Sequence, residues 1–417
     1  MLDDDIMKKI AIIMGRGIEG CGVTKFTIEQ CKYYAKHGYD YKVFASKDKS
    51  WTRKNAHITD FVHQLKFAKD NEVNAMIEEV NQYELAIINS LPALSLKDEA
   101  KDNFARMLSE IKIPIVLVQH DHAMASIRRN ACLDDAIKAA KVIFVHSTTN
   151  DFAKYANELV GPKVDLFETT EGTPIHSFQP GMYFDEVKEK YWKSNKPAFE
   201  SFVPECINVN HHKWIGRTTS WKGYIEMFKF HNEYLMPNDI LTTFEGIERS
   251  PAYLGFRELS EFVDCLPENI DEYNFDESYG DHVHVFGPYI QDEMLERMSK
   301  VGFGYQLSRM KPHFIQRSIE YTHCEVVCTG TIPVFHKKYG EACTHRHYGE
   351  KLIDMGNSGT IWLDENNLEE TFEQVLDLFD HPEKRNRMRN QAYEFYKLHQ
   401  DADYTFTELM NNIEKEI

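Results

Sequence analysis

The stretch Lys9–Thr24, KIAIIMGRGIEGCGVT, joins a short apolar run to a glycine-rich turn and the start of a helical pattern. Its first part, Lys9–Met14, has the length and unbroken apolar character of a strand buried on both faces. A helix is predicted from Thr24 to about Lys36 and ends before Gly38, because glycine is favoured just past a helix terminus. A strand, a turn and a helix in this order predict the first unit of a parallel α/β sheet.

The same alternation continues along the chain and restarts after a break. In the first part, strands are predicted at Tyr41–Phe44, Leu85–Ile88, Ile113–Val118 and Val142–Val145, with helices at Asn103–Ile111 and Leu133–Ala140. Residues 180–210 hold prolines, a glycine and many charges, which indicates a linker. After it, strands are predicted at Lys213–Ile215, Leu241–Phe244, Val283–Phe286, Gly302–Leu307, Thr331–Phe335 and Thr360–Leu363. Helices are predicted at Ser318–Cys328, at Leu368–Phe379, from Glu383 to about His399, and from Tyr404 to the end.

These elements predict an α/β fold with two Rossmann-like domains that face each other across a cleft. The expected domains are residues 1–190 and residues 205–394, with C-terminal helices at about 395–417 packing back on the first domain. Ligands of open α/β sheets bind outside the carboxyl ends of the strands. Function is therefore expected in the loops that follow the strands.

The composition excludes several classes of protein and raises one apparent objection. The chain has 417 residues, of which 42% are hydrophobic and 27% charged, so it is not a disordered chain, a collagen-like fibre or a membrane bundle. With 48 Lys and Arg against 66 Asp and Glu, the formal charge is −18, which argues against nucleic-acid binding. Net charge, however, describes the long-range field, whereas DNA contact needs only a local basic surface. If the chain binds DNA, its charge is predicted to be strongly asymmetric.

The sequence favours a reducing, cytoplasmic setting without a metal site. No apolar run approaches the roughly 20 residues that span a bilayer, and the acidic start lacks the apolar core of a signal peptide. The eight cysteines are thinly spread, so a disulfide framework is not expected. Cys343, His345 and His347 stand at alternate positions and could bind metal, but a zinc site usually needs a second ligand pair at a recognisable distance. The spacing of Cys206, His211 and His212 matches no standard pattern, and both clusters are interpreted as polar loop residues.

Two loops of the first half could carry chemistry. Gly15, Gly17 and Gly20 match G-x-G-x-x-G between a strand and a helix, where backbone N–H groups can cradle a phosphate or a sugar; a simple tight turn explains the pattern equally well. His120 and Asp121 follow the strand Ile113–Val118, where Asp121 could accept a proton or stabilise positive charge, or the histidines could bind metal. The alternative is that one of these side chains caps the next helix.

Two further loops belong to the second half. Arg217 and Lys222 lie in GRTTSWKG, just after a predicted strand, and such a cationic pair can clamp a diphosphate. The alternative is a solvated helix start. Glu320 and Glu325 precede the turn Gly330-Thr331-Ile332-Pro333, and a carboxylate in a cleft could bind a ribose diol; surface charge is the alternative for each.

At these residues the sequence resembles a known family. Glu325 followed by Gly330-Thr331, with Arg217 and Lys222 upstream, is similar to the signature of retaining GT-B glycosyltransferases. The longer runs resemble the DNA α-glucosyltransferases of T-even bacteriophages. These runs are Gly15–Phe26, Lys47–Arg53, Ile88–Pro92, Gln119–His122 with Arg128–Asn130, Trp214–Gly223, Glu245–Pro251, Glu293–Leu307, Gln316–Val334 and Trp362–Asn366.

The resemblance implies an activity, its partners and a set of site residues. Such enzymes transfer a sugar from a UDP-sugar to the hydroxymethyl group of 5-hydroxymethylcytosine in double-stranded phage DNA, which protects the DNA from host nucleases. The implied setting is a monomer in the cytoplasm of an infected bacterium, with UDP-glucose, or a pentose donor such as UDP-arabinose, and no obligatory metal. The residues implied to bind the donor are Gly20, Cys21, Gly22, Arg217, Lys222, Gly246, Tyr289, Ser318, Glu320, Tyr321 and Glu325.

The resemblance also places His120 and Asp121 at the reacting centre. Retention of configuration allows two routes, which the sequence leaves open. Asp121 could stabilise or attack the cationic sugar, or the acceptor could attack from the front while the leaving phosphate takes its proton. Arg317 occupies the position eight residues before Glu325, where the wider family often has a second glutamate, so Glu320 is the candidate to read the sugar hydroxyls.

Phosphate contacts are expected from a basic segment around Trp51. The candidate DNA-binding residues are Lys47, Lys49, Trp51, Arg53, Arg128 and Arg129. A solvated loop is the alternative for this charge run. Two other functions also remain open at this point: a GT-B enzyme that acts on a glycan or small molecule, and a non-catalytic protein that binds nucleotide sugars.

Overall fold

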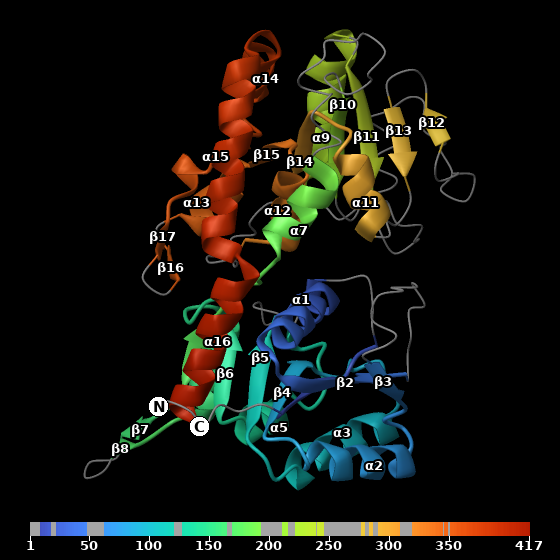
Figure 1. The fold of residues 1–417 in the computed structure, drawn as a ribbon, viewed down its shortest axis with the longest axis vertical. Coiled ribbons are helices and arrows are strands. Elements are labelled where there is room, and N and C mark those ends of the chain that lie inside the picture. Colours follow the sequence, from blue (N-terminus) through green and yellow to red (C-terminus); the bar gives the residue numbers. More distant parts are fainter. Residues whose placement is uncertain are drawn as a thin grey trace. The chain divides into compact units, whose positions relative to one another are not determined.

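The computed structural model divides the chain into two compact α/β units (Figure 1). It describes residues 9–17, 22–47, 62–120, 127–164, 169–192, 211–215, 222–238, 240–245, 277–279, 283–286, 291–308, 319–344, 346–348 and 351–417. The first unit holds the described residues up to Met182 together with Ala402–Ile417, and the second holds those from Tyr183 to Asp401.

The first unit is built on a seven-stranded sheet in which all neighbouring strands are parallel. The order across the sheet is β3 (Val62–Leu65), β2 (Asp40–Ser46), β1 (Lys9–Met14), β4 (Leu85–Ser90), β5 (Ile115–Gln119), β6 (Val142–Val145) and β9 (Ile175–Ser177). The central strands are buried almost throughout, which is why their sequences are continuously apolar rather than alternating.

Helices cover both faces of this sheet (Figure 1). One core joins the sheet to α2 (Asp70–Val80), α3 (Asp98–Glu110), α5 (Leu133–Ala139) and α6 (Asp151–Val160). On the other side α1 (Gly22–His37) pairs with α16 (Ala402–Glu416), where the rings of Phe26 and Phe406 lie 5.2 Å apart. The C-terminal helix is thus an integral part of the first unit. A two-stranded ribbon, β7 (Lys163–Val164) and β8 (Thr169–Thr170), completes it.

The second unit repeats the same plan with one antiparallel strand. Its sheet runs β12 (Glu277–Tyr279), β13 (Val283–Phe286), β11 (Leu241–Glu245), β10 (His211–Ile215), β14 (Phe303–Gln306), β15 (Ile332–His336) and β18 (Ile361–Leu363). β12, which was not predicted, is antiparallel to β13, whereas the six predicted strands are parallel to one another, as expected. The helices are α9 (Tyr224–Phe230), α11 (Gln291–Met298), α12 (Tyr321–Cys328), α13 (Lys337–Cys343), α14 (Leu368–Asp380) and α15 (Pro382–Gln400), and β16 (Arg346–Tyr348) pairs with β17 (Lys351–Ile353).

The segment expected to begin the linker is folded into the second unit. α7 (Phe184–Val187) is followed by a π-helical turn at Lys188–Trp192, and both contact α12. Asp185 accepts hydrogen bonds from Tyr393 and Lys397 of α15, with Lys397 Nζ at 2.6 Å. The described chain therefore changes unit at Met182, earlier than the expected limit near residue 190, and returns at Ala402 rather than near residue 395.

Both sheets share one strand order, and it locates their binding crevices. Apart from the edge strands β9 and β12, each sheet reads 3-2-1-4-5-6 when its parallel strands are numbered along the chain, which is the order of a doubly wound Rossmann fold. The direction of winding reverses between β1 and β4 in the first unit and between β10 and β14 in the second. Ligands of such sheets bind outside the carboxyl ends of the strands at these reversal points.

Candidate active site

At the reversal point of the second unit, four polar side chains converge. Lys222 Nζ lies 2.6 Å from Glu320 Oε2 and 3.0 Å from Ser308 Oγ. Gln306 Nε2 donates to the same carboxylate oxygen at 3.1 Å and to Ser308 Oγ at 2.6 Å. The side chains of Lys222 and Glu320 are only 13% and 25% exposed, so their attraction is less screened by solvent than that of a surface pair. We call these residues the Lys222 cluster.

The backbone explains why these side chains meet. Gly223 has a φ of +72°, and a Cβ there would lie 2.2 Å from the carbonyl oxygen of Leu307. Only glycine allows this conformation and this approach, which holds Lys222 against the end of β14. Glu320 is the extended residue before α12, and its N–H donates to the hydroxyl of Tyr339 at 3.1 Å.

The Lys222 cluster combines a cation with several hydrogen-bonding groups. Lys222 can bind an anionic oxygen as a point charge, while Glu320, Gln306 and Ser308 can exchange hydrogen bonds with hydroxyl groups. Sequence reasoning selected Lys222 and Glu320 but missed Gln306 and Ser308. A signal in the sequence was available, because Gln306 lies near the carboxyl end of the predicted strand Gly302–Leu307 and Ser308 directly follows that strand. Tyr321 and Glu325 lie on α12 directly after Glu320, and both are buried.

In the first unit, the start of the glycine loop packs against the end of β4. The N–H of Gly15 donates to Ser90 O at 2.8 Å, and a Cβ on Gly15 would lie 2.6 Å from Pro92 Cδ. Glycine is therefore required at Gly15 by a close approach of two backbones. A Cβ on Gly22 would meet no described atom within 4 Å, so crowding among the described residues does not demand glycine there.

His120 leaves the carboxyl end of β5 within a group of aromatic rings. Its ring centroid lies 4.8 Å from that of Phe26, 5.4 Å from Phe178 and 5.7 Å from His146, each in an edge-on geometry. The ring of His146 stacks on Phe178 at 4.4 Å. These contacts restrict the orientation of the imidazole. Sequence reasoning missed His146 and Phe178, although His146 follows the predicted strand Val142–Val145.

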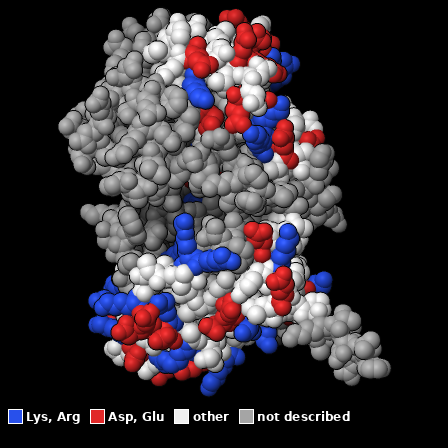
Figure 2. All heavy atoms as spheres, turned by 180° about the vertical axis from the view of Figure 1, so that it is seen from behind, with Lys and Arg blue, Asp and Glu red and all other residues white. Residues whose placement is uncertain are grey.

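Three of the candidate DNA-binding residues are described, and all three are exposed. Lys47 follows β2, and Arg128 with Arg129 forms the turn before Asn130. Over the described surface in Figure 2, Lys and Arg side chains are interspersed with Asp and Glu. The asymmetry of charge stays a prediction.

The other candidate site residues lie outside the described residues. They are Gly20, Cys21, Asp121, Arg217, Gly246, Tyr289, Ser318, Lys49, Trp51 and Arg53. Cys206 and His345 also lie outside, while Cys343 is buried at the end of α13. Across the described ranges, no group of three or more His, Cys, Asp or Glu side chains could hold a metal ion. None of the helices in that part of the chain is both long and apolar enough to cross a membrane.

Comparison with solved structures identifies the fold. The Anabaena protein HepE in complex with UDP-glucose matches with a TM-score of 0.60 and 11% identity, covering 98% of this chain and 100% of that chain. At this identity the likeness shows the fold alone. Two Rossmann-like units, each with its own strand reversal, give this chain the GT-B fold of glycosyltransferases, as predicted.

More similar proteins show the family. Residues 21–382 match the model of the DNA alpha-glucosyltransferase family. The DNA alpha-glucosyltransferase of Enterobacteria phage T4 is 41% identical over 413 residues, which cover 98% of this chain and 100% of that protein. An alpha-glucosyltransferase in complex with UDP-glucose and DNA containing an abasic site matches with a TM-score of 0.83 and 39% identity, covering 97% of this chain and 99% of that chain. This chain belongs to the DNA alpha-glucosyltransferase family and is an enzyme of that class, which confirms the resemblance seen in the sequence.

A third relative was solved with a modified base. An alpha-glucosyltransferase in complex with UDP and a 13-mer DNA containing an HMU base matches with a TM-score of 0.82 and 37% identity, covering 97% of this chain and 98% of that chain. Structures that match 97% of this chain have thus been solved with both a nucleotide and DNA.

Proposed function

We propose that this chain transfers glucose from UDP-glucose to the hydroxymethyl group of 5-hydroxymethylcytosine in double-stranded phage DNA, with retention of configuration. The Lys222 cluster carries the proposal, because it offers a cation and hydroxyl-binding groups at the strand reversal where a nucleotide sugar would bind. Relatives solved with UDP-glucose or UDP and with DNA support the choice of donor and acceptor.

The proposed donor site is centred on the second unit. Lys222 binds the diphosphate together with Arg217, and Gln306, Ser308 and Glu320 receive the sugar hydroxyls. Glu325 binds the ribose, Tyr289 lies toward the uracil, and Gly246, Ser318 and Tyr321 complete the site. From the first unit, backbone N–H groups at Gly20, Cys21 and Gly22 bind the phosphates.

The proposed chemistry separates positive charge on the sugar from negative charge on the leaving UDP. Lys222 and Arg217 stabilise the leaving diphosphate, so the transition state is favoured over the bound substrate. His120 and Asp121 stand at the reacting centre. Asp121 either stabilises the cationic sugar or attacks it, or the leaving phosphate takes the acceptor proton during front-face attack. An Asp121→Ala variant that kept normal turnover would remove Asp121 from both of its roles.

The proposed acceptor site belongs to the first unit. Lys47, Lys49, Arg53, Arg128 and Arg129 bind phosphates of the duplex, and Trp51 contacts the DNA among them. A base that enters a deep site must leave the stack, which costs roughly a few kcal/mol.

One experiment tests the donor and the acceptor together. Hydroxymethylated and ordinary DNA are incubated with UDP-glucose or UDP-arabinose, and the product nucleosides are analysed by mass spectrometry. We expect a hexose on 5-hydroxymethylcytosine only. A pentose product would show that the proposed sugar is wrong, and transfer to ordinary DNA would show that the proposed acceptor is wrong. No transfer to any DNA would overturn the proposal.

A further inference from the structure

We propose that Arg16 is a positioning residue that couples donor binding to DNA binding by joining the start of the glycine loop, Gly15–Gly17, to the Arg128–Arg129 turn through Asn130. The inference rests on the proposed function, because it takes the glycine loop as part of the donor site and the arginine turn as part of the DNA site. Nothing in the sequence distinguishes Arg16 from its neighbours, and its role follows from contacts across the sheet edge.

Arg16 reaches two other segments of the first unit from the end of β1. Its Nε donates to Leu91 O at 3.2 Å, and its Nη2 donates to Asn130 Oδ1. Its backbone N–H lies 3.4 Å from Ser90 Oγ. These described partners are neutral acceptors. Each hydrogen bond to a guanidinium is stronger than a neutral pair.

Asn130 is itself fixed to the loop that follows β4. It pairs with Ala93 in an antiparallel bridge, and it is buried. On either side, the N–H of Leu94 donates to Arg129 O at 2.9 Å, and the N–H of Ala131 donates to Pro92 O at 2.7 Å. Backbone hydrogen bonds therefore hold the end of the exposed arginine turn in place, and Asn130, which lies there, is the partner of Arg16.

Three segments distant in the sequence thus form one hydrogen-bonded assembly beside β1 and β4. If the link between Arg16 and Asn130 is lost, Gly15–Gly17 and the arginine turn must each be ordered separately when the ligands bind. That ordering costs conformational entropy, so both ligands should bind more weakly. Asn130 does not belong to the glycine loop, yet its substitution should weaken UDP binding.

The test is a double-mutant cycle read by binding rather than by turnover. Arg16→Gln, Asn130→Ala and the double variant are compared with the unaltered chain for UDP affinity by calorimetry and for DNA affinity by fluorescence anisotropy. Each single variant should weaken both affinities by about fivefold to tenfold, and the double variant should be no weaker than either single one. Asn130→Asp keeps an acceptor oxygen and should restore near-normal affinities.

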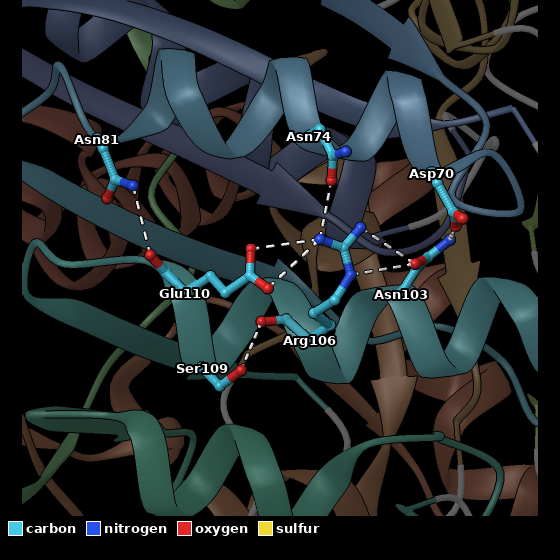
Figure 3. Close-up of polar contacts among 7 residues, drawn as sticks. All are labelled: Asp70, Asn74, Asn81, Asn103, Arg106, Ser109 and Glu110. Atoms are coloured by element: carbon cyan, nitrogen blue, oxygen red, sulfur yellow. Dashed lines mark hydrogen bonds and ion pairs between the residues drawn. The ribbon is translucent and has the colours of Figure 1, made fainter.

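Arg106 supplies the matched control for a purely structural role (Figure 3). It also links two segments of the same unit through an asparagine, since Nη1 donates to Asn74 Oδ1 of α2 at 2.8 Å, while Nε donates to Asn103 Oδ1 of its own helix at 3.4 Å. It lies on α3 against α2 rather than at the strand reversal. Arg106→Gln should lower the melting temperature while both affinities stay unchanged.

The outcomes separate the inference from the proposed function. Arg16→Gln affinities that match those of Arg106→Gln, or effects of Arg16→Gln and Asn130→Ala that simply add, would overturn the inference. A chain that transfers no sugar but shows the expected binding cycle would overturn the proposed function and leave the coupling intact. Normal sugar transfer without the expected non-additive effects on affinity would overturn the inference and leave the proposed function intact.

Discussion

Lys222 Nζ lies 2.6 Å from Oε2 of Glu320, and that same oxygen accepts a hydrogen bond from Gln306. The cation proposed to bind the donor diphosphate therefore carries its own counter-ion within the site. A diphosphate that binds Lys222 must share this charge with Glu320. The pair therefore connects diphosphate binding with sugar binding. Glu320 weakens the attraction of Lys222 for phosphate, and it also lies where the sugar hydroxyls are proposed to bind.

Replacing Glu320 should affect UDP binding and sugar transfer in opposite directions. Glu320→Gln keeps the size of the side chain but removes the negative charge that competes for Lys222. We expect UDP to bind about threefold to tenfold more tightly, which corresponds to roughly 1 kcal/mol, while turnover with UDP-glucose falls. Calorimetry with UDP and a steady-state assay measure the two effects. Glu296→Gln on α11, which breaks an exposed pair with Lys300 just beyond that helix, is the control and should change neither. Weaker UDP binding in Glu320→Gln would contradict the competition between carboxylate and diphosphate.

A side chain at Gly223 should destabilise the second unit. Gly223→Ala combines an unfavourable left-handed backbone with a contact of 2.2 Å to Leu307 O. We expect a loss of about 1–3 kcal/mol in the free energy of unfolding, together with weaker UDP binding as Lys222 is displaced. Denaturant unfolding measures the first effect. Gly22→Ala, where a Cβ meets no described atom within 4 Å, should leave the stability unchanged or raise it. Equal stabilities of the two variants would show that the Gly223 turn relaxes freely.

Removing Arg128 and Arg129, which are both exposed, should reduce the salt dependence of DNA binding. If Arg128 and Arg129 each contact a phosphate, the Arg128→Ala/Arg129→Ala variant should lower the slope of log affinity against log salt by about 1.8. Affinity should fall equally for DNA of any sequence. Anisotropy titrations at several salt concentrations measure the slope. Lys138→Ala/Lys141→Ala is a control of equal charge at and just beyond the end of α5, and a slope unchanged in both variants would exclude the arginines from the interface.

Acid should weaken the attachment of α7 to α15. Hydrogen bonds from Lys397 and then from Tyr393 lower the pKa of Asp185 below its usual range. Because the folded-state pKa is the lower one, Asp185 contributes stability above the unfolded value of about 3.9, and this contribution disappears as the pH falls through the folded value. Asp185 is largely exposed, so the effect is small, at most about 1 kcal/mol.

The comparison of Asp185→Asn with the unaltered chain isolates this contribution. Asp185→Asn should melt at a lower temperature near neutral pH and at the same temperature below the folded pKa of Asp185. Thermal melts over this pH range measure the difference. A difference that persists in acid would assign the effect to packing of α7 rather than to the charge of Asp185.

Much of the fold could be predicted because strands buried on both faces have a recognisable apolar sequence pattern. Lys9–Met14 and Val142–Val145 occur with the predicted limits, because apolar runs of this length bounded by turns favour strands of a covered sheet. Val283–Phe286 also keeps its predicted limits, although it contains His284. α2 was missed although Val73, Met76, Ile77 and Val80 have helical spacing, because its polar face dominates the local composition. The antiparallel strand β12 could not be predicted, because its direction depends on pairing with β13.

The sequence by itself determined the α/β class, the family and the separate candidate residues Lys222, Glu320 and His120, because these depend on local patterns and on long runs of shared residues. Only the tertiary structure decided which residues act together. The pairing of Lys222 with Glu320, the bond from Arg16 to Asn130 and the rings around His120 join residues that are far apart in the chain. Parallel sheets bring the ends of non-consecutive strands to one edge, and no local sequence pattern records which loops meet there.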